Sequence, residues 1–233
     1  MSAITDRIKN SIKLVIHGKD GVIDMVLCAI LAKGHILLED IPGVGKTTLV
    51  TALAKTMSLD YKRIQFTPDV LPSDLSGFTM YDKNTGEFRF REGAVFTNLF
   101  LADEINRTSP KTQSALLEVM EEQNVTVDGV THKLPVPFFV IATQNPVGAS
   151  GTQKLPESQL DRFMIRLSMG YPDHDSAIDI LRGDSHEIVD ELRPCLEKND
   201  ILTIQEQVAS VQVSDAILNY IVALTEVTRD NAM

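Results

Sequence analysis

The chain has 233 residues, of which 43% are hydrophobic and 23% are charged, and these values exclude a chain that is disordered throughout. With 22 basic and 32 acidic residues, the formal net charge is -10, which argues against a surface built mainly to hold a nucleic-acid backbone. The longest apolar run, which starts at Met25, is far shorter than the roughly 20 residues needed to cross a bilayer. The N-terminus lacks the pattern of a secretory signal, so we expect a cytoplasmic protein.

Five short runs with strand character are separated by stretches with helical character. Several of these runs are almost continuously apolar, which is typical of strands buried on both faces of a parallel sheet. The alternation of strand and helix predicts an α/β, doubly wound domain. The expected strands lie in His35–Asp40, Tyr61–Phe66, Asn98–Ile105, Pro137–Asn145 and Phe163–Met169.

Two further segments interrupt this alternation and are predicted to be β-hairpins inserted beside the sheet. Thr79–Gly93 is expected to turn near Asn84-Thr85-Gly86. Asn124–Leu134 is expected to turn at Asp128-Gly129, because an Asp-Gly pair between alternating residues favours a two-residue turn.

The pattern changes after Tyr171-Pro172, where only helical runs follow. We therefore expect a nucleotide-binding core over residues 1–171 and a small helical unit over residues 172–233. The last helix is expected to open at Ser214 and to carry an apolar stripe. The stripe consists of Ile217, Ile221, Leu224 and Val227.

A strand, a glycine-rich turn and a helix follow one another in HILLEDIPGVGKTTLV, a context that suits phosphate binding. Gly43 and Gly45 would allow close approach of the backbone, Lys46 would reach the β- and γ-phosphates, and the Thr47 hydroxyl would bind Mg²⁺. Asp40 stands where the usual loop pattern begins with glycine, so a purely structural turn is the alternative. The residues expected to hold the nucleotide are Gly43, Val44, Gly45, Lys46, Thr47, Thr48 and Asp103.

Two acids, Asp103 and Glu104, end the apolar run LFLADE. Acids at the carboxyl end of a parallel strand lie in the crevice where ligands bind. We expect Asp103 to hold Mg²⁺, directly or through water, and Glu104 to polarise the attacking water. The alternative is a strand end with two solvated acids.

Asn145 and Arg162 are weaker candidates for the same site. Asn145 ends the fourth run, where an amide could orient the water and sense the γ-phosphate, or where Asn-Pro could simply form a turn. Arg162 precedes the fifth run and either reaches the γ-phosphate of a neighbouring subunit or pairs with Asp161 or another local acid.

With these elements in order, the sequence resembles the AAA+ ATPases and, within them, the MoxR family. The resemblance is carried by LLEDIPGVGKTTL, RIQFTPDVLPSDLSG, TGEFRFREGAVFTNLFLADEINRTSPKTQSALLEVMEE, FFVIATQNP and LPESQLDRF, which cover most of residues 35–166. It implies an AAA+ P-loop core of five parallel strands with two hairpin inserts and a helical lid. Asp40 is similar to the family pattern, Asn145 corresponds to sensor 1, and Arg162 to the arginine finger. Gly18-Lys19 stands where relatives usually carry Gly-Gln, which leaves the choice of base open.

The resemblance also implies an activity and partners. MoxR proteins are hexameric ATPases that use ATP and Mg²⁺ and act as chaperones on protein partners, often with von Willebrand A domain proteins. One alternative is a nucleic-acid motor, but neither hairpin is strongly basic. Thr79–Gly93 has Lys83, Arg89 and Arg91 against Asp82, Glu87 and Glu92, and Asn124–Leu134 has Lys133 and His132 against Asp128. A second alternative is a scaffold that binds ATP without turnover.

In the AAA+ pattern the lid carries a sensor-2 arginine, which MoxR-like chains place in a Gly-Ala-Ser-Pro-Arg stretch. That stretch shortly follows a segment resembling YIVALTEVTRDNAM, with which this sequence ends. We therefore expect a lid truncated within residues 172–233, weak hydrolysis and poor ring formation.

The remaining ligand-type residues show no metal-binding spacing. The five His are scattered, and Cys28 and Cys195 form no CxxC pair, so we expect no metal besides Mg²⁺. Cys28 lies in the apolar run and is predicted to be a buried, small hydrophobic side chain.

Overall fold

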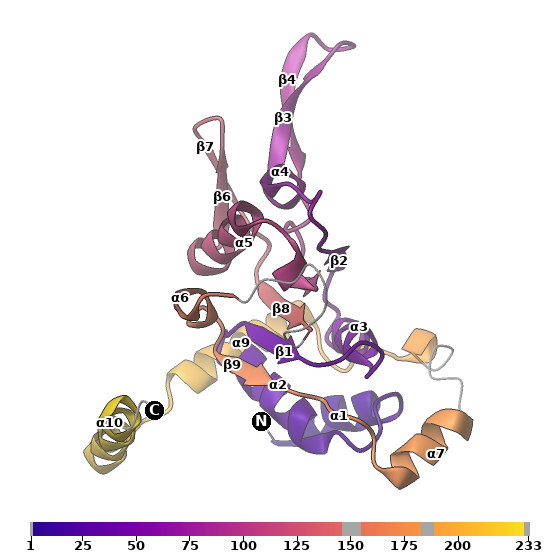
Figure 1. Ribbon diagram of the computed structural model, residues 1–233, viewed down its shortest axis with the longest axis vertical. Coiled ribbons are helices and arrows are strands. Elements are labelled where there is room, and N and C mark those ends of the chain that lie inside the picture. The colour runs from indigo at the N-terminus through magenta and orange to yellow at the C-terminus, as the bar shows by residue number, and fades with distance from the viewer. Residues whose placement is uncertain (1, 146–154, 183–188, 231–233) are drawn as a thin grey trace.

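The computed structural model describes residues 2–145, 155–182 and 189–230. Its centre is a parallel sheet with the strand order β2-β5-β8-β1-β9 (Figure 1). Each strand lies within one of the five predicted runs, so the predicted α/β fold is confirmed. The strands are β1 (Ile36–Glu39), β2 (Tyr61–Gln65), β5 (Leu99–Asp103), β8 (Phe139–Gln144) and β9 (Ile165–Leu167).

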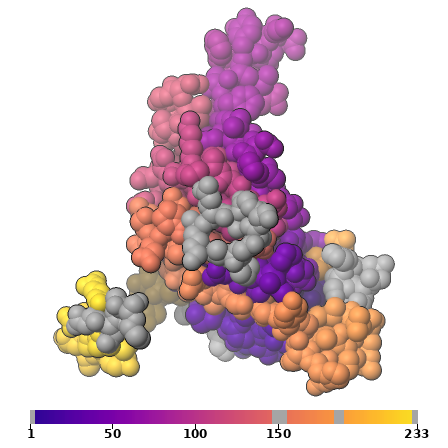
Figure 2. All heavy atoms as spheres, in the orientation of Figure 1, coloured from indigo at the N-terminus to yellow at the C-terminus, as the bar shows by residue number. Residues whose placement is uncertain are grey.

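Both predicted hairpins are present, and both project from the same end of the molecule (Figure 1 and Figure 2). The first consists of β3 (Gly77–Asp82) and β4 (Glu87–Glu92), and the second of β6 (Asn124–Val127) and β7 (Val130–Lys133). Asp128 and Gly129 have φ angles of 51° and 79°, as the tight turn between antiparallel strands requires. Each hairpin forms its own two-stranded sheet and leaves the central sheet uninterrupted.

Helices cover both faces of the central sheet. The helices α1 (Ser2–Lys13), α2 (Asp20–Leu31), α3 (Lys46–Thr56) and α9 (Lys198–Ala209) pack on one face, and α4 (Pro72–Ser76) and α5 (Pro110–Glu122) on the other. Alternate strand residues divide between the two layers: Leu38 and Ile141 face the first, Leu37 and Val140 the second. This alternation follows from the two-residue period of a strand. The shorter elements are the 3-10 helix η1 (Ile105–Arg107), α6 (Glu157–Leu160) and α7 (His174–Arg182).

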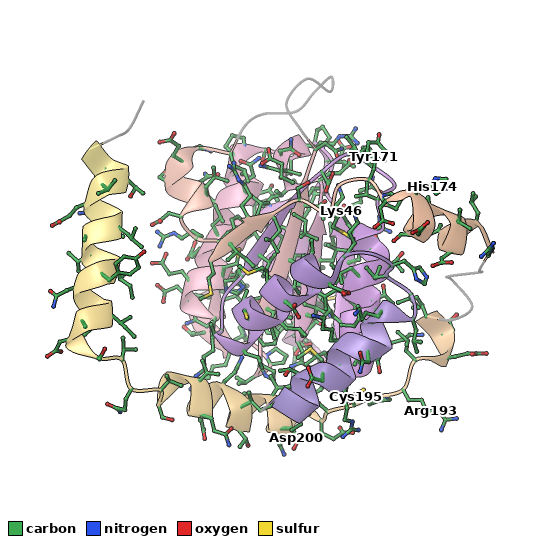
Figure 3. The ribbon with its side chains drawn as sticks, turned by 90° about the horizontal axis from the view of Figure 1, so that it is seen from below. Lys46, Tyr171, His174, Arg193, Cys195 and Asp200 are labelled. Atoms are coloured by element: carbon green, nitrogen blue, oxygen red, sulfur yellow. The ribbon has the colours of Figure 1, made fainter. Side chains whose placement is uncertain are left out.

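The helix α10 (Asp215–Asp230) follows Ser214 as predicted, and it stands apart from the body of the protein (Figure 3). Its apolar stripe is open to solvent: Ile217 is 53% exposed and Leu224 is 49% exposed. None of the helices in the described ranges is both long and apolar enough to span a bilayer.

The prediction that Cys28 is buried is wrong. The helix α2 buries the face that carries Ile23, Val26 and Ile30, whereas Asp24 and Cys28 are exposed. Asp24 and Cys28 are four residues apart and therefore share one side of the helix. An apolar run that continues around a helix does not reveal which residues face the core.

His35 joins three elements next to the start of β1. Its Nδ1 accepts a hydrogen bond from the Val140 N–H of β8 (3.0 Å), so the ring proton is on Nε2, which lies 3.0 Å from the Met120 carbonyl oxygen of α5. Burial lowers the pKa of His35, and the bond to Met120 offsets this only in part. A proton on Nδ1 would break the bond to Val140, so the buried ring is held neutral.

We expect His35 to make the protein less stable in mild acid. Its pKa is lowered on folding, so the unfolded chain binds the extra proton first as the pH falls below about 6.5. The free energy of unfolding should fall there by up to about 1.4 kcal/mol per pH unit from this group. Urea unfolding between pH 5 and 8 measures the free energy of unfolding, with His35→Asn as the control. If this free energy fell equally steeply with falling pH in both proteins, His35 would not be the group responsible.

Candidate nucleotide-binding site

The loop between β1 and α3 forms one side of the candidate site. Gly43 and Gly45 have φ angles of 85° and 89°, which L side chains rarely adopt, and Gly45 directly precedes the first residue of α3. The Nζ of Lys46 donates to the carbonyl oxygens of Asp40 (2.6 Å) and Ile41 (3.2 Å). Burial lowers the pKa of Lys46, against the raising effect of nearby carboxylates. The helix N-terminus and Lys46 together favour an anion.

Asp103 ends β5, and both of its carboxylate oxygens are hydrogen-bonded. Oδ2 accepts from Nε (3.2 Å) and Nη2 (2.6 Å) of Arg63, which lies on the neighbouring strand β2. Oδ1 accepts from the Thr143 hydroxyl on β8 at 2.5 Å. The carboxylate is therefore fixed by the strands on both sides of β5.

Glu104 is likewise bound by one arginine and by neutral donors. Oε2 accepts from Nη1 of Arg107 (2.6 Å), and Oε1 accepts from Nδ2 of Asn145 (3.0 Å). Burial alone would raise the pKa of Glu104, but hydrogen bonds from Arg107, Asn145 and Gln65, with the charge of Arg107, lower it below its ordinary value. The carboxylate is therefore ionised near neutral pH, as a group that polarises water must be.

Thr143 connects the two acids. Its hydroxyl donates to Asp103 and accepts the backbone N–H of Glu104 at 2.9 Å. Glu104 has a φ angle of 58°, in the left-handed region that is costly for a residue with a side chain. The bond from Thr143 helps to hold this conformation, and with it the direction of the Glu104 side chain.

The phosphate loop, the two acids and Asn145 line one cavity of about 410 Å³, a size typical of small-molecule sites. Its lining contains every predicted nucleotide-binding residue except Val44, whose side chain packs on the core beside α3. Arg63 and Gln65 were not predicted and also line it. The full lining is Pro42, Gly43, Gly45, Lys46, Thr47, Thr48, Arg63, Gln65, Asp103, Glu104 and Asn145.

Arg162 does not line this cavity. Its Nη1 lies 2.7 Å from Oε1 of Glu121 on α5, and both side chains are about half exposed. Within its own chain, Arg162 therefore pairs with an acid distant in sequence instead of reaching the phosphate loop.

The donor set suits Mg²⁺ that is bound together with phosphates. Thr47 and Asp103 supply a hydroxyl and a carboxylate oxygen to the same cavity, and Mg²⁺ prefers oxygen ligands while keeping several waters. In the part of the chain that the structure describes, no three His, Cys, Asp or Glu side chains gather to hold a metal alone. Phosphate oxygens and water would complete the coordination.

The contacts of Arg63, Arg107 and Thr143 with the two acids were not predicted from the sequence. Thr143 could have been found, because a hydroxyl inside a fully buried strand needs a hydrogen-bond partner. Arg107 lies three residues after Glu104, a spacing that brings side chains together on a helical turn. Arg63 depends on the pairing of β2 with β5, which places Gln65 opposite Asp103 and which no local pattern reveals.

The fold and the cavity define a P-loop ATPase of the AAA+ class. A profile of the ATPase family associated with various cellular activities matches residues 35–165. The crystal structure of a protein from Cytophaga hutchinsonii assigned as an ATPase superposes with a TM-score of 0.84 at 42% identity, over 97% of this chain and 71% of that one.

Sequence relatives define the family within this class. The chain is 40% identical to Chaperone MoxR1 of Mycobacterium tuberculosis over 94% of its own length, and 31% identical to Protein MoxR of Methylorubrum extorquens. It is 54% identical to the uncharacterized protein YeaC of Bacillus subtilis. The chain belongs to the MoxR family of AAA+ ATPases. It spans 58% of MoxR1, 67% of the Methylorubrum protein and 69% of YeaC.

We expect Thr143→Val to lower ATP hydrolysis by about tenfold or more, the scale of one hydrogen bond to a charged group. Nucleotide affinity should stay within about threefold, because the phosphate loop is unchanged. Phosphate release and calorimetric titration measure the two effects, and thermal melts check folding. Thr143→Ser retains the hydroxyl and should retain most of the activity. Equal losses in both variants would rule out the hydroxyl as the cause.

Proposed function

We propose that this chain binds ATP with Mg²⁺ in the cavity and hydrolyses it to ADP and phosphate. One observation carries the proposal: the ends of β1, β5 and β8 bring Lys46, Asp103, Glu104 and Asn145 to one cavity. A cation, two acids and an amide are the groups that phosphoryl transfer to water requires.

The residues divide the work in the following way. The backbone of residues 43–48 and the Lys46 ammonium hold the phosphates, and Thr47 and Asp103 hold Mg²⁺. The metal neutralises phosphate charge when it is bound. Glu104 accepts a hydrogen bond from water, whose oxygen attacks the γ-phosphorus as the bond to the ADP oxygen breaks. Asn145 orients the same water and keeps Glu104 in place.

Assembly and lid form the second part of the proposal. Arg162 is about half exposed and lies outside the cavity of its own chain, which supports a role at the γ-phosphate of a neighbouring subunit. We infer that copies of this chain assemble into a ring, and the resemblance to the MoxR family gives six as the expected number of subunits. Residues 172–233 contain α7, α9 and α10. Of these, α9 packs on the central sheet beside α2, and we infer that α7 and α10 belong to the helical lid.

The third part concerns the substrate. The hairpin of β3 and β4 exposes apolar side chains far from the core: Phe88 is 75% exposed and Tyr81 is 51% exposed. Part of its charge is paired, with Arg89 lying 3.6 Å from Asp82. An exposed aromatic surface with paired charges suits a protein chain better than a phosphate backbone. We therefore infer remodelling of protein partners. The resemblance to the MoxR family, and not the hairpin, gives a von Willebrand A domain protein as the expected partner type.

We expect Lys46→Ala and Glu104→Gln to separate binding from hydrolysis. Lys46→Ala should weaken ATP binding by about 10- to 100-fold, because the phosphates lose a charged donor. Glu104→Gln should bind ATP normally but lower turnover by about 100-fold or more. Calorimetry and phosphate release measure both effects. The controls are Lys55→Ala, on the same helix, and Glu118→Gln, which is exposed on α5. Normal turnover in Glu104→Gln would exclude Glu104 as the water-polarising group.

We expect activity to return when Arg162→Ala and Lys46→Ala proteins are mixed. A mixed ring contains interfaces where an intact phosphate loop faces an intact arginine. The control replaces the Lys46→Ala protein by the double variant Lys46→Ala/Arg162→Ala, which supplies no intact arginine. Phosphate release is measured against mixing ratio, with ring formation checked by light scattering. If mixed rings form and stay inactive, Arg162 does not act across the interface.

A further inference from the structure

The carboxylate of Asp40 is buried and fully hydrogen-bonded. Asp40 is 7% exposed, and its Oδ2 accepts from the N–H of Met169, the N–H of Gly170 (2.8 Å) and the hydroxyl of Ser168 (3.0 Å). Its Oδ1 accepts from the N–H of Ile41 at 3.2 Å. Asp40 begins the phosphate loop, whereas residues 168–170 directly follow β9. The side chain therefore joins two segments that are about 130 residues apart.

The same residue also contacts the phosphate-binding lysine. The Asp40 carbonyl oxygen accepts from Nζ of Lys46 at 2.6 Å, although the Asp40 side chain does not line the cavity. If Lys46 binds phosphate as proposed above, its ammonium would exchange this carbonyl for phosphate oxygens. Asp40 would then combine a backbone contact that changes with nucleotide and a side-chain contact to residues 168–170, which follow β9.

The segment that Asp40 holds leads to α7. Gly170 has a φ angle of 61°, and Tyr171 follows it on the way from β9 to His174, the first residue of α7; Figure 3 labels Tyr171 and His174. A second tether holds this path: Nζ of Lys19 donates to the Tyr171 carbonyl oxygen at 2.7 Å. Only the tether at Asp40 includes a residue that Lys46 contacts.

We propose that Asp40 is a positioning residue that fixes the backbone of residues 168–170 against the phosphate loop and makes the stability of that segment depend on bound nucleotide. The proposal rests on nucleotide binding at Lys46, as proposed above. Phosphates order the loop that carries Asp40, so the amides that its carboxylate holds open less often. The start of α7 then responds to the state of the cavity.

Reciprocity sets what a change at Asp40 does to nucleotide affinity. If bound nucleotide holds residues 168–170 more firmly, the contacts of Asp40 favour nucleotide binding by the same factor, and Asp40→Gly and Asp40→Asn lose that contribution. The same variants relieve the repulsion between the carboxylate and the phosphates, which acts in the opposite direction. The role of Asp40 is therefore read from the difference in amide exchange between the free and the nucleotide-bound protein, because merely structural damage would speed exchange in both states and leave the slowing by nucleotide in place.

Amide hydrogen exchange of the full chain tests the proposal, with and without a non-hydrolysable ATP analogue and Mg²⁺. In the wild type, the analogue should slow exchange at Met169 and Gly170 by about tenfold, the scale of one hydrogen bond to a charged group. In Asp40→Gly and Asp40→Asn, each measured at a saturating concentration of the analogue, this slowing should be lost. Thermal melts identify a variant that fails to fold, and Asp40→Asn preserves the size of the side chain.

Lys19→Met is the matched control, because it removes the tether at Tyr171 and leaves Asp40 in place. Since Lys19 stands at the position expected to contact the base, the analogue is added at a concentration that saturates this variant as well. Its exchange at Met169 and Gly170 should slow on nucleotide binding as in the wild type. The proposal is overturned if the wild type binds the analogue without that slowing, or if folded Asp40 variants keep the slowing. Failure of the wild type to bind the analogue would overturn the proposed function as well, so the two failures are distinguishable.

Discussion

Parallel pairing of β1, β8 and β5 is the constraint on which the site depends. Because the three strands run side by side in the same direction, their carboxyl ends meet at one edge of the sheet. The phosphate loop, the two acids and Asn145 each follow one of these ends. Residues spread over about 100 positions of the chain therefore surround one cavity without any long-range motif.

Charge compensation is the second requirement at this edge. Asp103 and Glu104 are adjacent and partly buried, and each is bound by its own arginine and by at least one neutral donor. Removing one partner from such a group costs more than the pair contributes, because the remaining charge loses its compensation. Arg63, Arg107 and Thr143 are therefore as necessary to the geometry as the acids themselves.

The strands, the hairpins and most of the residues that line the cavity could be predicted because their signals are local. Continuous apolar runs marked β5 and β8, and Asp128-Gly129 marked a turn. The contacts of Arg63 and of Arg162 could not be predicted, since each depends on how distant elements pack together. Arg63 meets Asp103 through the β2–β5 register, and Arg162 meets Glu121 through the packing of α5. The prediction that Cys28 is buried was wrong for a related reason, because the composition of an apolar run does not show which side of a helix faces the core.

The left-handed backbone of Glu104 sets stability and chemistry against each other at one position. Glycine adopts a φ angle near 58° without strain, whereas glutamate pays on the order of 1 kcal/mol for it. Selection for folding alone would favour glycine or asparagine here. Under the function proposed above, an acid is retained here only while hydrolysis is selected, so a descendant of this chain that lost its need for ATP turnover would be free to drift at position 104 towards a more stable, inactive protein.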